Sequence, residues 1–130
     1  AIPYLERAKN IFRTDAVIMR NLADAYLHTG QREKAIQALQ YLLELDFNNI
    51  PAIKLLASLH IKNGDTLRAI TLYNTYSRRY PNSSLPYLQV SKIYQDQGNL
   101  ERAISILQNA LKKPNMENKD QIEAKLNQLQ

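Results

Sequence analysis

The residue types that carry catalysis, metal binding or phosphate binding are few in this sequence. There are no cysteines, and the two histidines, His28 and His60, fall in different segments at different angular positions, so they do not make a metal pair. No nucleophile accompanies a base in a catalytic pattern, and no glycine-rich phosphate loop is present. The sequence therefore predicts a protein that is not an enzyme and that holds no metal or cofactor.

The chemistry that remains is binding, through apolar and basic side chains that recur in three segments. The first segment contributes Val17, Arg20, Asn21, Asp24, Leu27 and His28, the second Pro51, Lys54, Leu55, Ser58, Ile61 and Lys62, and the third Leu85, Leu88, Gln89, Lys92, Gln95 and Asp96. Apolar side chains can anchor a partner, and cations can pair with its acidic residues. This combination favours an extended or helical peptide that carries apolar and acidic residues.

A repeat of 34 residues sets the spacing of these segments. The stretch GQREKAI at 30–36 returns as GDTLRAI at 64–70 and as GNLERAI at 98–104, and the chain has no glycine outside these stretches. Each glycine follows one apolar helical pattern and precedes another, at a place where a left-handed backbone costs glycine little. Each repeat is therefore predicted to be a helical hairpin.

The apolar positions within each hairpin fall on one side of a helix. In the first repeat, Met19, Leu22, Ala23 and Tyr26 span an arc of roughly 100°. The second helix carries Ala35, Ile36, Leu39, Leu42 and Leu43. Small residues such as Ala35, Ala69 and Ala103 let the two helices approach closely. Helix starts are predicted at polar capping residues, namely Thr14, Asp15, Asp65, Ser83 or Ser84, Asn99 and Asn118.

The binding residues lie on the other side of the first helix of each hairpin. They cluster in an arc centred about 150° from the buried stripe, and their apolar members have no predicted core to enter. Stacked hairpins would make this side a concave surface. Two other interpretations are that these side chains pack against the helix of the next repeat, or that they are simply tolerated at the surface.

The pattern L-A-x-x-Y-x-x-x-G-x-x-x-x-A, read in Leu22, Ala23, Tyr26, Gly30 and Ala35, resembles the tetratricopeptide repeat. The resemblance covers nearly the whole chain. It implies an all-α fold, a right-handed superhelical α-solenoid of antiparallel helix pairs with about eight helices. We expect a single domain. Its expected parts are the second helix of a truncated repeat at 1–15, full repeats at 16–49, 50–83 and 84–117, and a capping helix or the start of a further repeat at 118–130.

The resemblance also implies a protein or peptide partner. Co-chaperones of this family hold the carboxylates of heat-shock chaperone tails in a clamp of Lys, Asn, Asn, Lys and Arg. The corresponding positions here hold Arg20, Asp24, Leu55, Leu85 and Gln89. Only the first is chemically similar, and Asp24 would repel a carboxylate. The sequence therefore predicts a non-catalytic interaction scaffold without the chaperone clamp.

Three other roles compete with partner recruitment by the concave face. In the first, the segment is a structural spacer within a longer solenoid. In the second, it associates with itself through the incomplete first repeat, where Leu5, Ala8 and Ile11 would be exposed. The third role, binding of nucleic acid through Arg78 and Arg79, is disfavoured because the neighbouring tyrosines, Tyr73 and Tyr76, occupy core positions of the repeat.

Composition agrees with a globular helical chain and leaves its location open. The 130 residues are 45% hydrophobic and 22% charged, and the net charge of +5 is spread along the chain rather than gathered in one run. The sequence predicts no membrane insertion and no signal peptide. Because it begins in the middle of a repeat and without methionine, we expect it to be part of a longer protein.

Overall fold

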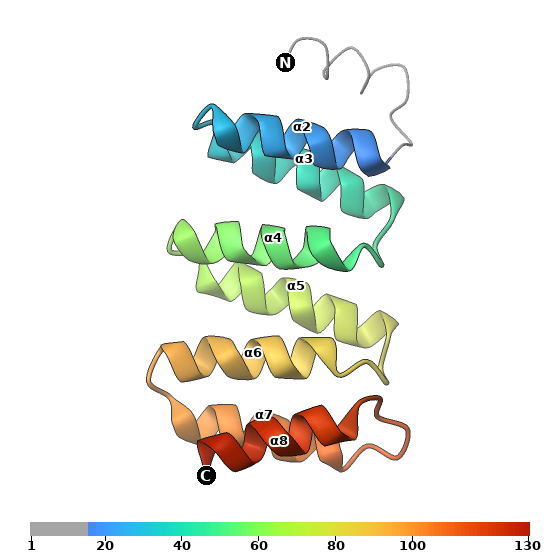
Figure 1. Ribbon diagram of the computed structural model, residues 1–130, viewed down its shortest axis with the longest axis vertical. Coiled ribbons are helices and arrows are strands. Elements are labelled where there is room, and N and C mark those ends of the chain that lie inside the picture. The colour runs from blue at the N-terminus through green and yellow to red at the C-terminus, as the bar shows by residue number, and fades with distance from the viewer. Residues whose placement is uncertain (1–15) are drawn as a thin grey trace. The chain divides into compact units, whose positions relative to one another are not determined.

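The computed structural model describes residues 16–130, and the regular secondary structure within that range is helical. In this described range, seven helices follow one another: α2 (Ala16–His28), α3 (Arg32–Leu45), α4 (Ile50–Lys62), α5 (Thr66–Arg79), α6 (Leu85–Asp96), α7 (Leu100–Leu111) and α8 (Lys119–Leu129). Within each of the two units defined below, Figure 1 shows successive helices running antiparallel, which confirms the predicted all-α fold of helix pairs. The helix predicted in the first twelve residues, and the caps predicted at Thr14 and Asp15, lie outside the described range.

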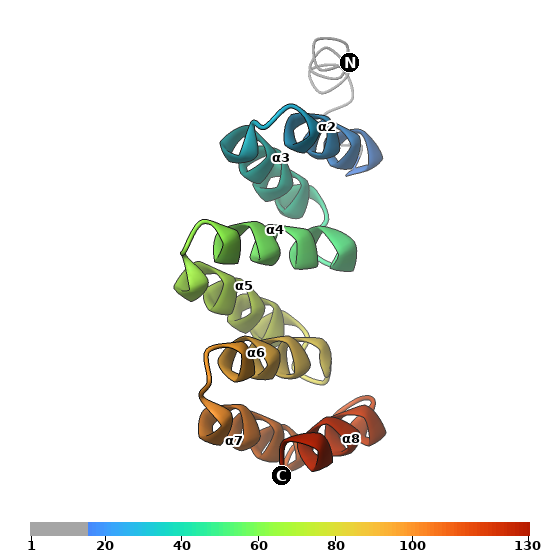
Figure 2. The ribbon, with the colours of Figure 1, turned by 60° about the vertical axis from the view of Figure 1, so that its left-hand side comes forward.

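Two compact units divide the chain, with the boundary within α5 between Ala69 and Ile70. The described part of the first unit holds α2, α3, α4 and the first residues of α5. The second unit holds the rest of α5 with α6, α7 and α8. Within the second unit, α8 lies beside α7, as Figure 2 shows.

The core of the first unit is built from the predicted stripes. Met19, Leu22, Ala23 and Tyr26 of α2 are all buried, and so are the five apolar positions predicted for α3. From α4, the buried residues include Ile53, Leu56 and Ala57. Because apolar residues recur at intervals of three and four along each helix, every helix turns one continuous stripe toward its neighbour.

The second unit is packed in the same way, with one exception to the predicted stripe. Val90 and Ser91 of α6 are buried, and the hydroxyl of Ser91 donates a hydrogen bond of 3.2 Å to the carbonyl oxygen of Ala103 in α7. Ala103 is fully buried, so the two helices approach closely at this point, as predicted from their small residues. Tyr94, in contrast, is only half-buried, whereas its repeat equivalents Tyr26 and His60 are buried.

The turns within the hairpins depend on their glycines. Gly30, Gly64 and Gly98 have φ values of 74°, 78° and 81°, in the left-handed region that glycine occupies most easily. In the first turn, the amide of Gln31 donates to the carbonyl oxygen of Tyr26 at 2.8 Å, which closes the end of α2. The glycine repeat therefore fixes the place where each first helix ends.

Some of the predicted capping residues cap their helices in the structure, and others do not. Asn99 and Asp65 accept hydrogen bonds from the amides of Arg102 and Arg68, as predicted. The cap predicted at Asn118 is wrong, because its backbone is left-handed, with φ of 54°, and its side chain makes no capping bond. A capping residue normally has an extended backbone, which turns its side chain toward the first helical amides. Asn49 is a cap that the sequence did not predict, and its side chain accepts a hydrogen bond from the amide of Ala52.

Candidate functional site

The predicted binding residues belong to both units. Those of α2 and α4 lie in the first unit, and those of α6 lie in the second. None of the predicted residues is fully buried. Val17 is 67% exposed and Ile61 is 41% exposed, which is high for apolar side chains on packed helices. The half-buried members are Arg20, Asp24, Leu27, Leu55, Leu85, Leu88 and Gln89, and the others are exposed: Asn21, His28, Lys54, Ser58, Lys62 and Lys92.

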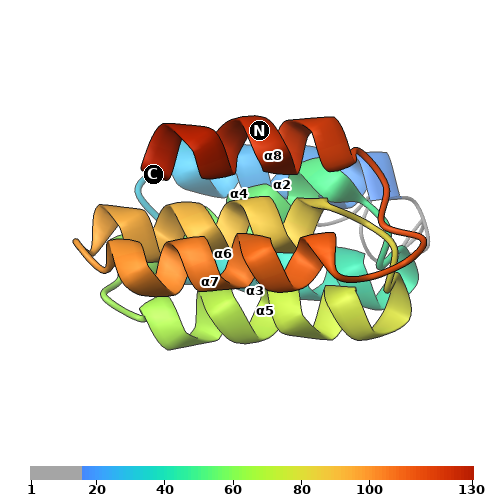
Figure 3. The ribbon, with the colours of Figure 1, turned by 90° about the horizontal axis from the view of Figure 1, so that it is seen from below.

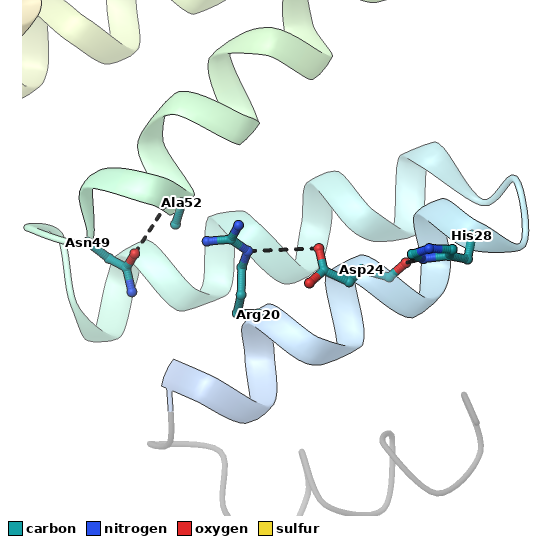
Figure 4. Close-up of polar contacts among 5 residues, drawn as sticks. All are labelled: Arg20, Asp24, His28, Asn49 and Ala52. Atoms are coloured by element: carbon teal, nitrogen blue, oxygen red, sulfur yellow. Dashed lines mark hydrogen bonds and ion pairs between the residues drawn. The ribbon is translucent and has the colours of Figure 1, made fainter.

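Three polar residues of α2 interact with one another, as shown in Figure 4. Nε of Arg20 lies 3.8 Å from Oδ1 of Asp24, one helical turn later. Nδ1 of His28 donates a hydrogen bond of 2.7 Å to the backbone oxygen of Asp24. The pair of Arg20 and Asp24 is partly exposed and too long for a hydrogen bond, so it contributes little stability. Asp24 thus places a carboxylate beside Arg20, whereas Lys54 and Lys62 of α4 are exposed cations.

A cleft of about 540 Å³ brings several predicted residues of the first unit together. Leu27 of α2 and Leu55 of α4 line it, together with Lys62 near the end of α4. Leu59, which is buried, supports the same wall. This cleft combines leucine side chains and Lys62, as the sequence predicts for binding a peptide, with further polar residues at its rim.

The rim of this cleft contains residues that the sequence analysis missed. The guanidinium of Arg32, at the start of α3, donates to the side-chain oxygen of Asn63 at 2.8 Å. The side-chain amide of Asn63 in turn donates to a carboxylate oxygen of Glu33 at 3.2 Å. These bonds connect the start of α3 to the end of α4. No periodic pattern marks such residues, because they lie at helix ends where the repeat requires only a turn.

In the second unit, the predicted residues of α6 are used in part for internal packing. Leu88 packs against a core cluster of Leu107, Ala110, Met116 and Ile122. Nζ of Lys125 in α8 donates to Oε1 of Gln95 in α6 at 2.7 Å. The expectation that the apolar members lack a core to enter is therefore wrong for Leu88. The reason is that α8 supplies Ile122 to the core cluster against which Leu88 packs. Figure 3 shows the courses of α6, α7 and α8.

The connection before α8 is also attached to the start of α6. The amide of Glu117 donates to the backbone oxygen of Asn82 at 2.7 Å. The side-chain nitrogen of Asn118 donates to the hydroxyl of Ser84 at 3.4 Å. Ser84 and Asn118 are therefore joined to each other instead of capping their own helices. These contacts hold α8 in place and support packing, rather than partner binding, for the neighbouring side chains of α6.

His60 occupies a position where the repeat elsewhere has tyrosine, and it is buried as predicted. Burial lowers the pKa of His60 below its ordinary value of 6.5, because the charged ring would lose its hydration. Asp65 and Glu33 raise this pKa and Arg68 lowers it, each by less than burial does. The unfolded chain therefore binds a proton near pH 6.5 that the folded chain binds only at lower pH. The contribution of neutral His60 to the free energy of unfolding is therefore fully present above pH 6.5. It decreases as the pH falls through that value.

We expect the variant His60→Tyr to lose this part of the pH dependence, since tyrosine is the residue found at the equivalent positions 26 and 94. The measurement is urea unfolding at pH 7.5 and pH 5.5, with the change in free energy compared between variant and parent. The control is Gln37→Ala, which changes an exposed residue that does not titrate and should leave the pH dependence as it is. If His60→Tyr and the parent lose equal stability between pH 7.5 and pH 5.5, the pH dependence does not come from His60.

The basic pair considered for nucleic acid lies at the end of α5, and both members are exposed. Arg78 donates to the hydroxyl of Thr75 at 3.2 Å. The rings of Tyr76 and Tyr80 lie 4.7 Å apart, and Tyr76 is buried. Tyr76 is therefore engaged in packing and is not a free platform on which a base could stack.

Two other kinds of feature are absent from the part of the chain that the structure describes. Within residues 16–130, histidine, aspartate and glutamate side chains form no group of three that could hold a metal ion. In the same range, no helix combines the length and the apolar character needed to span a membrane.

Models of one kind of protein repeat match successive parts of the chain. Three family models, each described as tetratricopeptide repeat, match residues 1–59, 55–83 and 86–112. Together these matches cover most of the sequence. No curated protein matches the sequence at a significant level.

Solved structures with similar folds have low sequence identity to this chain. A crystal structure of MamA has 22% identity and a TM-score of 0.67 over 95% of this chain and 69% of that chain. MamA 41-end from Desulfovibrio magneticus RS-1 has 16% identity and a TM-score of 0.59 over 98% and 82%. A chain in the structure of Naa15/Naa10 bound to HypK-THB has 21% identity and a TM-score of 0.62 over 87% and 17%. Likeness at this level of identity shows a shared helical-repeat fold.

Proposed function

The chain belongs to the tetratricopeptide repeat family, and we propose that it is a non-catalytic scaffold that binds a segment of a partner protein in its first unit. The observation that carries this proposal is the cleft in which Leu27, Leu55 and Lys62 meet. An apolar side chain of the partner would enter against the two leucines, and an acidic residue beside it would pair with Lys62. Lys54, exposed on the same helix, adds a second positive charge.

The relative size of these two effects decides what the partner must contain. Burying one large aliphatic side chain contributes about 1.5–3 kcal/mol, whereas an exposed ion pair contributes about 0.2–1 kcal/mol. The apolar anchor therefore supplies most of the affinity. The lysines mainly select acidic segments and increase the rate of encounter.

The proposal is tested by affinity capture from a lysate of the source organism, with Lys54→Glu/Lys62→Glu compared with the parent chain. We expect the affinity for a captured protein to fall about tenfold, or about 1.4 kcal/mol, because attraction is replaced by repulsion. The control is Lys112→Glu/Lys119→Glu, which makes the same change in net charge in the second unit. If both variants retain the same proteins as the parent, the cleft does not select an acidic partner.

A structural spacer is the second candidate function, and the contacts of α6 favour it for the second unit. There Leu88 contributes to the core and Gln95 binds Lys125, so these two residues already have partners within the chain. A spacer predicts that neither lysine variant changes capture. The proposed scaffold predicts that only the variant in the first unit does.

Self-association through Leu5, Ala8 and Ile11 stays a prediction, because these residues lie outside the described range. We expect the average mass in sedimentation equilibrium to rise with protein concentration, and the rise to be smaller when Leu5 and Ile11 are replaced by serine. A constant monomer mass at high concentration would argue against association.

A further inference from the structure

A second hollow, of about 220 Å³, lies in the second unit between α5, α6 and α7. Tyr87, Val90 and Tyr94 of α6 form one wall, and Asn74 of α5 and Asn109 of α7 lie at its edges. The residues that α6 contributes here are different from the α6 residues predicted for the concave face. The hollow is therefore a separate feature, and what it binds is independent of the function proposed for the first unit.

The two tyrosines of this hollow are held in place, and each has a cation over its ring. The hydroxyl of Ser77 donates to the Tyr87 oxygen at 3.3 Å. The guanidinium of Arg102 lies 5.2 Å from the centre of the Tyr94 ring, and Nζ of Lys113 lies 5.9 Å from the centre of the Tyr87 ring. Both distances are within the range of a cation–π interaction. The aromatic wall is therefore ordered and carries positive charge at two points.

The volume of the hollow limits the size of its occupant. Pockets for drug-sized molecules measure about 300–1,000 Å³. A hollow of about 220 Å³ is smaller and suits one large apolar side chain instead. The half-buried Tyr94 agrees with this, because its equivalent Tyr26 is buried by the helices of the first unit. Surface that the chain leaves partly open here is available to an anchor residue of a partner.

The charge of the hollow limits the chemistry of that partner. Among the described residues that line it, Arg102 is the one with an ionised side chain. A neighbouring hollow continues along α7 and shares Arg102 and Asn109 with the first. Glu101 lines that continuation, so an acidic residue of a partner is favoured beside Arg102 and disfavoured further along α7.

We propose that this hollow binds a peptide segment of a partner protein through one leucine, methionine or phenylalanine side chain placed against Tyr87 and Tyr94. An aspartate or glutamate adjacent to that residue pairs with Arg102. The side-chain amides of Asn74 and Asn109, exposed at the edges, bind the backbone of the peptide. The chain thus has a second binding site for an apolar–acidic motif, built from other residues than the cleft of the first unit.

The test is selection of a phage-displayed library of random nine-residue peptides on the full chain, followed by binding of the selected peptides to variants. Asn109→Trp and Asn74→Trp each place a large ring at the edge of the hollow from an exposed helical position. We expect clones with an apolar residue next to an acidic one, whose affinity falls at least tenfold in both tryptophan variants. In Arg102→Gln the affinity should fall severalfold.

The controls use neighbouring residues of the same helix and its C-cap. Gln108→Trp and Lys112→Gln change exposed residues that do not line the hollow, and they should leave the affinity unchanged. Circular dichroism checks that all variants are equally helical. The proposal is overturned if no clone is enriched, or if every enriched clone binds the tryptophan variants as tightly as the parent. Clones without an acidic residue, unaffected by Arg102→Gln, would overturn the assigned role of Arg102.

Discussion

Replacement of Leu107 by alanine is expected to lower the free energy of unfolding by about 2–5 kcal/mol. Leu107 is fully buried in α7 and belongs to the cluster that Ala110, Met116 and Ile122 complete. The loss combines the transfer of a large side chain with the cavity that it leaves. Since a domain is stable by about 5–15 kcal/mol, this single change removes a large part of the total.

Urea unfolding followed by circular dichroism measures this effect, and hydrogen exchange locates it. Exchange should increase most in α6, α7 and α8, because their side chains surround the cavity. The neighbouring exposed residue serves as the control, and Gln108→Ala should change stability by less than about 0.5 kcal/mol. A small effect of Leu107→Ala would show that α7 and α8 do not share a packed core.

The second large effect is expected from Ala103→Leu, which should destabilise the chain by about 1–3 kcal/mol. Ala103 is fully buried, and its carbonyl oxygen accepts the hydrogen bond from Ser91 across the gap between α6 and α7. A leucine at this position would push the helices apart and lengthen that bond. The cost therefore comes from excess volume rather than from lost contacts.

The matched control for this prediction is the same substitution at an exposed alanine. Ala124 lies on α8 and is exposed, so Ala124→Leu should be nearly neutral in thermal unfolding. If both substitutions are neutral, the small residues of the repeat do not set the distance between the helices. If both destabilise the chain equally, the effect is not specific to the contact between α6 and α7.

The features that the sequence predicts well are those that depend on periodicity. The buried stripe of α2 and the positive φ values of the glycines both depend on interactions within one hairpin. Their physical causes act over a few residues, so the spacing of residue types is sufficient to predict them.

The features that the sequence does not predict depend on contacts between segments outside the repeat pattern. Leu88 enters a core because Ile122 of α8 packs beside it, and the chain before α8 departs from the repeat. Asn118 has a left-handed backbone, so its residue type alone gave the wrong cap. Tyr94 has the same residue type as Tyr26 but is less buried, since it borders the hollow in the second unit.

In the candidate site, too, some residues were predicted from periodicity and others depend on contacts between segments. The sequence places Leu27, Leu55 and Lys62 on the binding side of two helices, and the structure brings these three residues into one cleft. The rim residues Arg32 and Asn63, however, lie at helix ends, and their hydrogen bond joins segments that are far apart in the sequence. Patterns within one helix cannot indicate such a contact.

The most direct test of the proposed scaffold is photo-crosslinking in cells of the source organism. The photoreactive amino acid p-benzoylphenylalanine is placed at Ser58, exposed on α4, and separately at Gln37, exposed on α3. We expect a covalent adduct with one partner protein from position 58 and none from position 37. No adduct at position 58, or equal adducts from both positions, would contradict the claim that this side of α4 binds a partner.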